Sequence, residues 1–536
     1  MAVRPSVRKR WLYPIAVLVG TAICVYGGLY TLDRILDGSG DITSWFAFQH
    51  DHITDSVGGL SGTIAAVLGI IITVVSIIVQ LSAERYAQVT DMFFRDRTNR
   101  GVLAFYVIGC VCGIFNAFSI HDDFVPRVSL TVMVVVAIVG FAIMAPYFAY
   151  VFDFLQPENI IARIRKDAQS AARTGAKAVD TALDEAQRSA LAGMEQLTDI
   201  TINSISGKDK IIATAGVDAL KDFAVGYLEF KKDAKPPWFA VGKGIRENPD
   251  FVAMDPESLR DLESRKHWVE WKALRQYLGI YNEALGGMRD INYLIAIDTR
   301  YIGEAAIRAG DHEALALCVK FFNSYLRATL NAKDVRTAYN ILNQYRQLAE
   351  AVMRAGWHDK AVEVAGYIKY YGHVSYANKL AFVTETVAYD LCALCEVAHA
   401  AKSPVEGRIL QTFLEVDQPA GEGDVLETGL RGVRKAQVKL ATYYLVSEAE
   451  PLARRIFDDM KNERPERLKS IRDELMAVES EDFWEVIDRG ANFDYLPPDR
   501  KAALKTFFGW FNRLSGELPA TPAVQTPAQT SKEATS

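Results

Sequence analysis

Apolar residues gather in four long runs within the first 155 residues, and no run of similar length follows. An α-helix needs about 20 mostly apolar residues to cross the roughly 30 Å hydrocarbon core of a bilayer. The runs therefore predict transmembrane helices at about 11–30, 57–81, 102–120 and 128–152. We assign residues 1–158 to a four-helix transmembrane domain, for which the lipid bilayer is the first expected partner.

Lysine and arginine are distributed unevenly between the predicted loops. They gather before the first run, after the second and after the fourth, whereas the loop after the first run holds five aspartates and only one basic residue, Arg34. Positively charged flanks are retained in the cytoplasm when a membrane protein inserts. Both termini are therefore expected in the cytoplasm, and the two remaining loops are expected outside.

Beyond residue 158 the hydrophobic positions recur mostly with a helical period. Residues 159–255 predict stalk helices and then a small β-hairpin, with strands at Trp238–Val241 and Asp250–Met254. Residues 256–514 predict a large cytoplasmic all-α domain, and the Pro-, Thr- and Ser-rich end at 515–536 predicts a disordered tail. The expected fold class is mainly α.

Two turns in the large domain resemble each other. Arg308–His312 and Arg354–His358 both read Arg-Ala-Gly-X-His, and they start 46 residues apart. A weaker third case joins Leu440–Leu445 to Leu452–Met460. A helix, a tight turn and an Ala-rich second helix form the αα-hairpin of solenoid proteins, which predicts a solenoid-like domain. An irregular helical bundle is the alternative, because a stable array normally needs about three repeats.

Composition narrows the expected chemistry. The chain has 60 Lys and Arg against 66 Asp and Glu, and no dense basic face is evident, so nucleic acid is not an expected partner. Three of the six cysteines lie in predicted spans and three in the predicted cytoplasmic region, where thiols stay reduced. No nucleophile or phosphate-loop motif stands out, so neither a cofactor nor a catalytic residue is expected.

Small and polar residues form a stripe along one face of the second predicted span. They recur at alternating steps of four and three: Gly62, Ala66, Gly69, Thr73, Ser76 and Gln80. Such a stripe either packs closely against neighbouring helices or lines a water-filled path between subunits. In the third span, Gly109 and Gly113 have the spacing of a helix-packing motif, and Asn116 needs a polar partner, for which Thr73 and Ser76 are candidates.

Imidazoles and carboxylates on the predicted outer face are candidate metal ligands. The group comprises His50, Asp51, His52, Asp55, His121, Asp122 and Asp123. Acidic outer loops also arise because positive charge is kept inside, and the spacing matches no zinc signature. Cys392, Cys395 and His399 share one helix face, where buried cysteines beside a histidine are the preferred interpretation over a metal site.

Three stretches carry a resemblance to a known family: Thr73–Ser82, Met92–Arg97 before the third run, and Phe154–Ile164. They resemble a bacterial family of predicted membrane proteins known only as a domain of unknown function, family 2254. The similarity extends from Val57 to about Ala224, and the chain departs from the family pattern around Ile205–Lys210, as a divergent member would. The resemblance implies a bacterial inner-membrane protein and brings no catalytic residues.

These features support two hypotheses of different classes. In the first, the protein is a membrane-anchored scaffold or sensor whose cytoplasmic helical domain binds a protein partner. Tyrosines of that domain are candidates for contacts with the partner or for the core: Tyr345, Tyr367, Tyr370, Tyr371 and Tyr389. In the second, a homo-oligomer forms an ion channel or transport-related protein with the second span lining the pore. An enzyme is the least supported class, because no catalytic motif is found.

Overall fold

Helices make up most of the part of the chain that the structure describes, and no strand occurs in that part. The structure is a computed structural model, and it describes residues 20, 24, 28, 31, 35, 50–83, 89–121, 126–178, 182–417, 427–483, 489 and 492–514. The chain divides into unit 1, residues 1–168 and 195–219, and unit 2, residues 169–194 and 220–536. The predicted tail at 515–536 lies outside the described residues, as does the predicted span at 11–30 apart from three isolated positions.

Unit 1 contains three helices that are long and apolar enough to cross a membrane. They are α2 (His50–Ala83), α4 (Arg97–Phe118) and α5 (Arg127–Phe154), and the short helix α3 (Val89–Arg95) connects α2 to α4. The predicted count of four is therefore not supported among the described residues. Many apolar side chains of α4 and α5 are exposed, such as Ile108 at 61% and Phe115 at 66%, as lipid-facing positions require.

The three long helices of unit 1 pack through an apolar face of α2. The buried side chains of that face follow a helical period: Val57, Ile64, Val67, Ile71, Val75 and Val79. They face α4 and α5, which pack against each other as well. Between α4 and α5, the hydroxyl of Tyr106 donates a hydrogen bond to the carbonyl oxygen of Gly140 at 2.6 Å, so the one buried polar group of that side chain is paired.

Three helices follow the spans and contribute to both units: α6 (Pro157–Gly175), α7 (Ala182–Ser206) and α8 (Lys210–Lys231). The predicted β-hairpin after them is wrong. The 3-10 helix η2 (Pro236–Phe239) and the short helix α9 (Lys243–Arg246) occupy the first strand and its turn, and residues 250–253 form turns.

Side chains explain why no hairpin forms there. Trp238 is buried, and its ring lies 5.0 Å from that of Trp268. The carbonyl oxygen of Trp238 accepts hydrogen bonds from Trp268 Nε1 at 2.9 Å and Gln187 Nε2 at 3.0 Å. Because these side chains take the backbone acceptor that a partner strand would need, the segment is held without a ladder.

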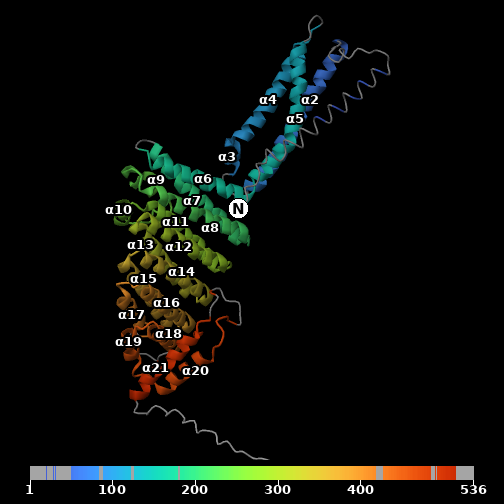
Figure 1. The fold of residues 1–536 in the computed structure, drawn as a ribbon. Coiled ribbons are helices and arrows are strands. Elements are labelled where there is room, and N and C mark those ends of the chain that lie inside the picture. Colours follow the sequence, from blue (N-terminus) through green and yellow to red (C-terminus); the bar gives the residue numbers. More distant parts are fainter. Residues whose placement is uncertain are drawn as a thin grey trace, which may run out of the picture. The chain divides into compact units, whose positions relative to one another are not determined.

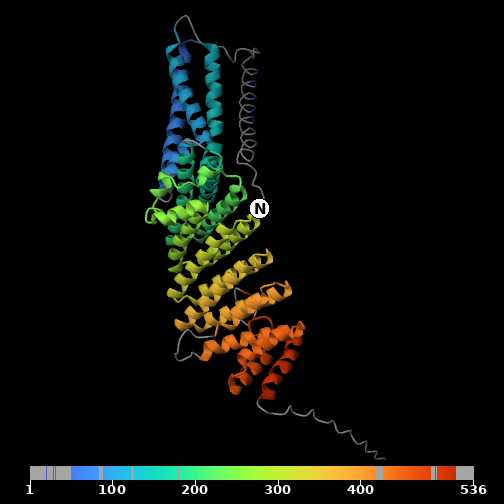
Figure 2. The same cartoon turned by 90° about the vertical axis from the view of Figure 1, so that its left-hand side faces the viewer.

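Unit 2 continues as an array of helical hairpins in two layers. The first helix of each hairpin belongs to what we call the even-numbered layer: α12 (Arg289–Ala309), α14 (Val335–Arg354), α16 (Ala381–Ala400) and α18 (Glu427–Val446). The odd-numbered layer comprises α11 (Trp268–Leu285), α13 (His312–Asn331), α15 (His358–Ala377), α17 (Glu406–Leu414) and α19 (Glu450–Met460). Successive helices within each layer pack on one another along the array (Figures 1 and 2). Three further helices belong to the unit: α10 (Pro256–Ser264), α20 (Pro465–Ala477) and α21 (Pro498–Leu514).

The hairpins recur with a constant spacing. The even-numbered helices α12, α14 and α16 begin at residues 289, 335 and 381, which are 46 residues apart each time. Residues with positive φ, between 48° and 81°, mark the turns at a step of 23 residues or twice that: Gly310, Lys333, Gly356, Lys379, Lys402 and Glu448. The array therefore has four related hairpins, two more than the glycine-containing turns of the sequence indicate.

Each of these turns closes its helix in the same way. In all six, the amide following the positive-φ residue donates to a carbonyl five residues earlier, with N···O distances of 2.7–3.2 Å. This is the Schellman arrangement, which satisfies the last carbonyls of a helix and needs one left-handed residue. Glycine adopts that conformation without a Cβ clash, whereas Lys and Glu adopt it at a cost of about 1 kcal/mol or more.

A buried ion cluster holds the start of the array. Lys231 Nζ at the end of α8 lies 2.6 Å from Glu270 Oε1 of α11 and 2.6 Å from Asp311 Oδ2. Asp311 also caps α13, since its other carboxylate oxygen accepts from the amide of Ala314 at 2.9 Å. Two carboxylates around one ammonium group thus join the end of α8 to α11 and to the start of α13.

Candidate functional site

A segment from late in the chain crosses the even-numbered layer. Arg489 and residues 492–495, which we call the crossing segment, follow α20 in the chain yet contact α14, α16 and α18. The contacts span up to 150 residues of sequence. The crossing segment makes these contacts through a basic, an aromatic and an acidic side chain.

Arg489 provides the basic contact. Its guanidinium donates to both carboxylate oxygens of Asp390 on α16, at 2.6 and 3.2 Å, and to the backbone carbonyl of Tyr339 on α14. It also lies over the Tyr339 ring, 4.1 Å from the centroid. The side chains of Arg489 and Asp390 are only 7% and 2% exposed. Because the pair is withdrawn from water, removing one partner leaves a buried charge uncompensated.

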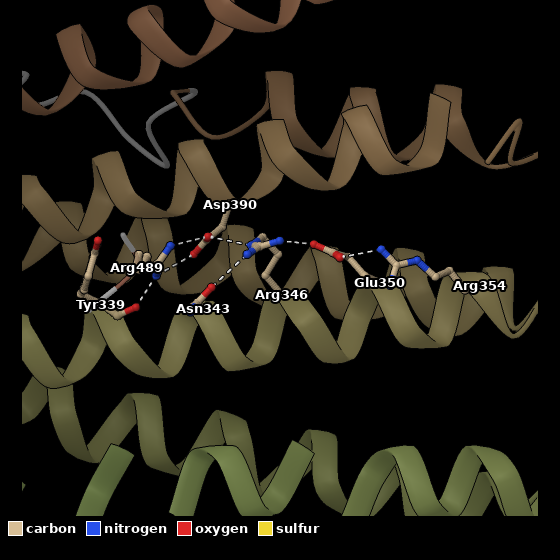
Figure 3. Close-up of polar contacts among 7 residues, drawn as sticks. All are labelled: Tyr339, Asn343, Arg346, Glu350, Arg354, Asp390 and Arg489. Carbon is tan, nitrogen blue, oxygen red and sulfur yellow. Dashed lines mark hydrogen bonds and ion pairs between the residues drawn. The ribbon is translucent and has the colours of Figure 1, made fainter. Parts of the chain in front are cut away.

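Asp390 is shared by a second arginine. Arg346 of α14 donates to Asp390 at 3.2 Å and to Asn343 Oδ1 at 2.9 Å, as the dashed lines in Figure 3 mark. Arg346 also pairs with Glu350, whose second carboxylate oxygen accepts from Arg354 at 3.1 Å. The band of alternating charges along α14 therefore fixes the orientation of the carboxylate that receives Arg489.

Phe493 and Asp494 provide the aromatic and acidic contacts. The Phe493 ring stacks on Tyr389 of α16 with centroids 4.5 Å apart, and Lys439 of α18 donates to the carbonyl oxygen of Phe493. Asp494 accepts from the Tyr389 hydroxyl at 2.7 Å and from Lys435 Nζ at 2.9 Å. Burial, with a further contribution from the Asp494 charge, raises the pKa of Tyr389 well above its ordinary value, so the hydroxyl remains a donor at neutral pH.

A cavity of about 280 Å³ lies beside the crossing segment. Its charged lining has four basic and two acidic side chains: Arg346, Lys439, Arg489, Arg500, Asp390 and Glu396. Arg500 donates to both oxygens of Glu396, at 2.8 and 3.2 Å. Burial lowers the pKa of Lys439. Two of its lining side chains donate to the crossing segment: Lys439 donates to the carbonyl oxygen of Phe493, and Tyr389 donates to the carboxylate of Asp494.

No pattern in the sequence predicts the crossing segment, although one of its contacts involves a tyrosine named as a candidate from the sequence. Tyr389 lies under Phe493, whereas Tyr345 and Tyr371 are buried and donate to the side-chain and backbone oxygens of Asn323 at 3.0 and 2.6 Å. Tyr367 and Tyr370 are exposed. Arg489, Phe493 and Asp494 were missed because the stretch around them has neither a helical nor a strand period.

The predicted stripe on α2 lies on the face opposite to the buried valines and isoleucines. All six of its residues are exposed: Gly62, Ala66, Gly69, Thr73, Ser76 and Gln80. A Cβ atom added at Gly62 or Gly69 would meet nothing within 4 Å. The Thr73 hydroxyl donates within its own helix, to the carbonyl of Gly69 at 2.8 Å. The stripe is an open surface on a single chain.

The glycines predicted in the third span lie instead at a close contact between helices. A Cβ atom at Gly113 would lie 2.6 Å from Ser61 Oγ and 2.8 Å from Met133 Cε, and one at Gly109 would lie 3.2 Å from Val136 Cγ1.

Asn116, one turn further along α4, finds its partner on α5. It accepts a hydrogen bond from the Ser129 hydroxyl at 2.6 Å, and its Nδ2 lies 3.5 Å from Met133 Sδ. The predicted partners Thr73 and Ser76 are wrong, because both lie on the exposed face of α2.

The candidate metal ligands fall partly outside the described residues. Asp122 and Asp123 are not described, and neither are the side chains of His50, Asp51 and His52. Asp55 is exposed, and His121 Nδ1 lies 3.2 Å from the carbonyl oxygen of Ser119. Among the residues that the structure describes, no three His, Cys, Asp or Glu side chains are grouped so that they could hold a metal ion.

Cys392 and Cys395 are buried in α16, and burial raises the pKa of both thiols. His399, on the same helix, has its Nδ1 2.7 Å from Glu406 Oε1. The three side chains are therefore used in packing and in a pair with a carboxylate, and the raised pKa values disfavour the thiolate form that binds metals.

Comparison with known proteins adds one finding to this geometry. Residues 8–223 match the model of the family described as "Predicted membrane protein (DUF2254)", which confirms the resemblance seen in the sequence. No curated protein and no solved structure matches the chain. The matched range ends within α8, so the hairpin array and the crossing segment lie beyond it.

Proposed function

We propose that this chain is a multi-pass protein of a bacterial inner membrane that displays its hairpin array in the cytoplasm as a binding surface for a protein partner. One observation carries the proposal: the even-numbered layer already holds a non-helical segment from later in the chain, the crossing segment, through Arg489, Phe493 and Asp494. Layered helical hairpins are a common scaffold for binding peptides along a surface. In this proposal a partner segment with similar side chains occupies the same surface.

Charges at the ends of the spans support the proposed orientation. The end at which α4 begins and α5 ends carries Arg95, Arg97, Arg163 and Lys166. The opposite end carries Asp55, His121 and Arg127. Because basic residues mark the cytoplasmic side, we assign the array, which follows α5 in the chain, and the C-terminus to the cytoplasm. Assigning the N-terminus there as well requires that the predicted span at 11–30 also crosses the membrane.

A peptide competition experiment tests the proposed binding surface. The probe is a fluorescent peptide with the sequence of residues 486–497, added to the full-length protein in detergent. In the variant Arg489→Ala/Phe493→Ala/Asp494→Ala the surface is released from its own segment, and we expect it to bind the peptide at least tenfold more tightly than the wild type. The reason is that a tethered segment competes at an effective concentration in roughly the millimolar range.

The matched control is the same peptide with alanine at the positions of Arg489, Phe493 and Asp494. It should bind neither protein, because it lacks the basic, aromatic and acidic groups. If the triple variant, shown by circular dichroism to remain folded, bound both peptides equally or neither of them, the even-numbered layer would not be a selective surface for peptides of this kind.

The alternative function, a homo-oligomeric channel or transport-related protein, is favoured by the exposed stripe on α2. Exposed small and polar residues are unfavourable against lipid and are suited to contact with another copy or with water. The mass of the detergent-extracted complex is the first test, and a ring of three or more chains is the supporting result. Gly69→Leu and Ser76→Leu should then abolish ion flux in liposomes without preventing assembly, and unchanged flux in both variants contradicts this function.

A further inference from the structure

A basic pocket lies in unit 1 at one end of the candidate spans. It has a volume of about 890 Å³, and it is formed where α3, the start of α4 and the first half of α6 meet. The residues that argue for a ligand are four basic side chains, Arg95, Arg97, Arg163 and Lys166. Since α4 begins at Arg97 and α5 ends at Phe154, the pocket is placed at the boundary between the hydrocarbon core and water.

The pocket is held in shape by Asp96, the residue that caps α4. Its carboxylate accepts from the amides of Thr98 and Asn99 at 2.9 and 3.2 Å, from the Tyr150 hydroxyl at 2.8 Å and from Arg163 Nη1 at 3.3 Å. Burial acts to raise the pKa of Asp96, but these hydrogen bonds and the Arg163 charge outweigh it and lower the pKa. Asp96 therefore stays ionised and positions Arg163 before any ligand arrives.

Arg163 is also fixed from its other side. Its guanidinium carbon lies 4.0 Å from the centre of the Phe154 ring at the end of α5. A planar guanidinium held between a carboxylate and a ring face keeps donors available in a defined direction. The pocket is thus built around an oriented arginine.

Positive charge remains in excess after these pairings. Asp96 compensates Arg163, and Asp167 is the other acidic residue of the lining. Arg97 and Lys166 are exposed, and neither forms an ion pair within the described part of the chain. A pocket with surplus guanidinium and ammonium groups favours a phosphate, whose oxygens accept several charge-assisted hydrogen bonds.

An exposed aromatic side chain lies on the helix that borders the pocket. Phe93 of α3 is fully buried, and its ring packs edge-on against Phe154 with centroids 5.5 Å apart. The next residue, Phe94, is 56% exposed. Aromatic side chains favour the headgroup region of a bilayer, so α3 is suited to lie at the level of lipid phosphates while Phe94 contacts the acyl chains.

We propose that this pocket binds the phosphate of an anionic phospholipid of the adjoining leaflet, such as phosphatidylglycerol. Basic pockets at the cytoplasmic ends of membrane helices are suited to such headgroups. A zwitterionic lipid is disfavoured, because it would bring its ammonium group next to Arg97 and Lys166. The inference is independent of the proposed partner surface, which lies in unit 2.

The test is native mass spectrometry of the full-length protein with phosphatidylglycerol or phosphatidylcholine of identical acyl chains. The variant Arg97→Gln/Lys166→Gln removes two pocket charges. The matched control Arg100→Gln/Arg165→Gln removes two charges from the same two helices without touching the pocket lining. We expect the pocket variant to reduce the preference for phosphatidylglycerol about thirtyfold, which corresponds to about 1 kcal/mol for each basic residue near a membrane surface. The control should retain the preference.

A second arm separates a lipid from a soluble phosphate. Glycerol 3-phosphate is added to the protein in phosphatidylcholine nanodiscs, and binding is followed by calorimetry. Binding of phosphatidylglycerol alone supports the proposal as stated, because the acyl chains are then required. Binding only of the soluble phosphate, no preference for phosphatidylglycerol, or equal losses in the two double variants overturns it. Lys166→Gln alone serves if the double variant is not recovered as folded protein, and it should lower the preference about fivefold.

Discussion

The helix α2 and the even-numbered layer of the array use polar residues in opposite ways. On α2 the small and polar residues lie on the exposed face, and the helix packs inside unit 1 through valine and isoleucine. In the array, charged groups such as Asp390 and Arg489 are buried and paired with each other. The comparison shows that a stripe of small and polar residues does not by itself locate an internal contact. The stripe of α2 lies on the exposed face, whereas Gly109, Gly113 and Asn116 of α4 are buried.

The physical reason lies in the solvent of each region. In water, apolar burial drives packing, and polar groups enter the interior only when hydrogen bonds satisfy them. In lipid, apolar residues suit both the inner and the outer face, so apolar side chains are free to form the contact with α4 and α5. The small and polar residues of the stripe therefore lie on the outer face of unit 1, where they are available for contact with another molecule.

The largest expected effect comes from breaking the buried pairing of the array. Asp390→Ala leaves Arg346 and Arg489 without their shared carboxylate, and we expect the free energy of unfolding to fall by about 3–5 kcal/mol. Urea unfolding of the full chain in detergent measures the change. Arg408→Ala is the control, because its pair with Asp359 is exposed and should contribute no measurable stability. Equal losses of unfolding free energy in both variants would show that the buried pair contributes no more to stability than the exposed pair.

The second-largest expected effect concerns two glycines of unit 1, Gly113 at a contact between helices and Gly69 on the exposed stripe. Gly113→Leu introduces atoms into the contact with Ser61 and Met133, and we expect a loss of about 1–3 kcal/mol, seen as earlier thermal aggregation in detergent. Gly69→Leu fills open space on the stripe and should leave the stability of a single chain unchanged. If Gly69→Leu were equally destabilising, the stripe would be a contact surface within the protein as purified.

Acid should destabilise the array through one buried side chain, His267. His267 is 3% exposed, and burial, with the nearby Lys231 charge, lowers its pKa to about 4 from an ordinary value of 6.5. Between these values the unfolded chain binds the proton and the folded chain does not, so stability is lost as the pH falls through this window. We expect a loss of roughly 1–2 kcal/mol at pH 5 relative to pH 8.

Unfolding of the wild type and of His267→Gln at both pH values measures this dependence. The variant carries no titrating group at residue 267, so its stability should fall less on acidification. The same fall in both proteins would assign the acid sensitivity to other groups.

The smallest expected effect concerns the repeated turns. Lys402 occupies a left-handed position with φ of 48°, the counterpart of Gly356 one repeat earlier. Lys402→Gly should stabilise the array by about 1 kcal/mol, and Gly356→Ala should destabilise it by about 1 kcal/mol, because only glycine enters that region without a Cβ clash. Thermal unfolding of the two variants gives the values, and a loss of stability in Lys402→Gly would contradict the argument.

The turns also explain how much of the fold the sequence could predict. Gly310 and Gly356 mark two turns in a way that composition reveals, whereas Lys402 and Glu448 adopt the same conformation without a signature. The array was therefore predicted from two clear hairpins and a weaker third one, at Leu440–Leu445 and Leu452–Met460, which is the pair α18 and α19. The hairpin of α16 and α17 was not predicted. Apolar runs located α2, α4 and α5 well, although α4 begins at Arg97 and not near residue 102, because Asp96 caps a polar first turn.

The candidate site was less predictable than the fold. The crossing segment depends on contacts between residues 54 to 150 positions apart, such as Phe493 with Lys439 and Arg489 with Tyr339. No local period or motif marks such contacts. The hairpin predicted around Trp238 failed for a related reason, since distant side chains take the backbone acceptor that a strand partner would use.

The long reach of the crossing segment also sets an order of events during synthesis. Each hairpin closes through contacts within its own stretch of about 46 residues, and such local structure forms early as the chain leaves the ribosome. Arg489 is translated 43 residues after Val446, the last residue of α18, which at 5–20 residues per second leaves the complete even-numbered layer uncovered for roughly 2–9 seconds. During this interval the even-numbered layer of the nascent chain is folded, but the crossing segment does not yet occupy it. Another polypeptide present at that moment binds the layer without competition from the chain's own segment.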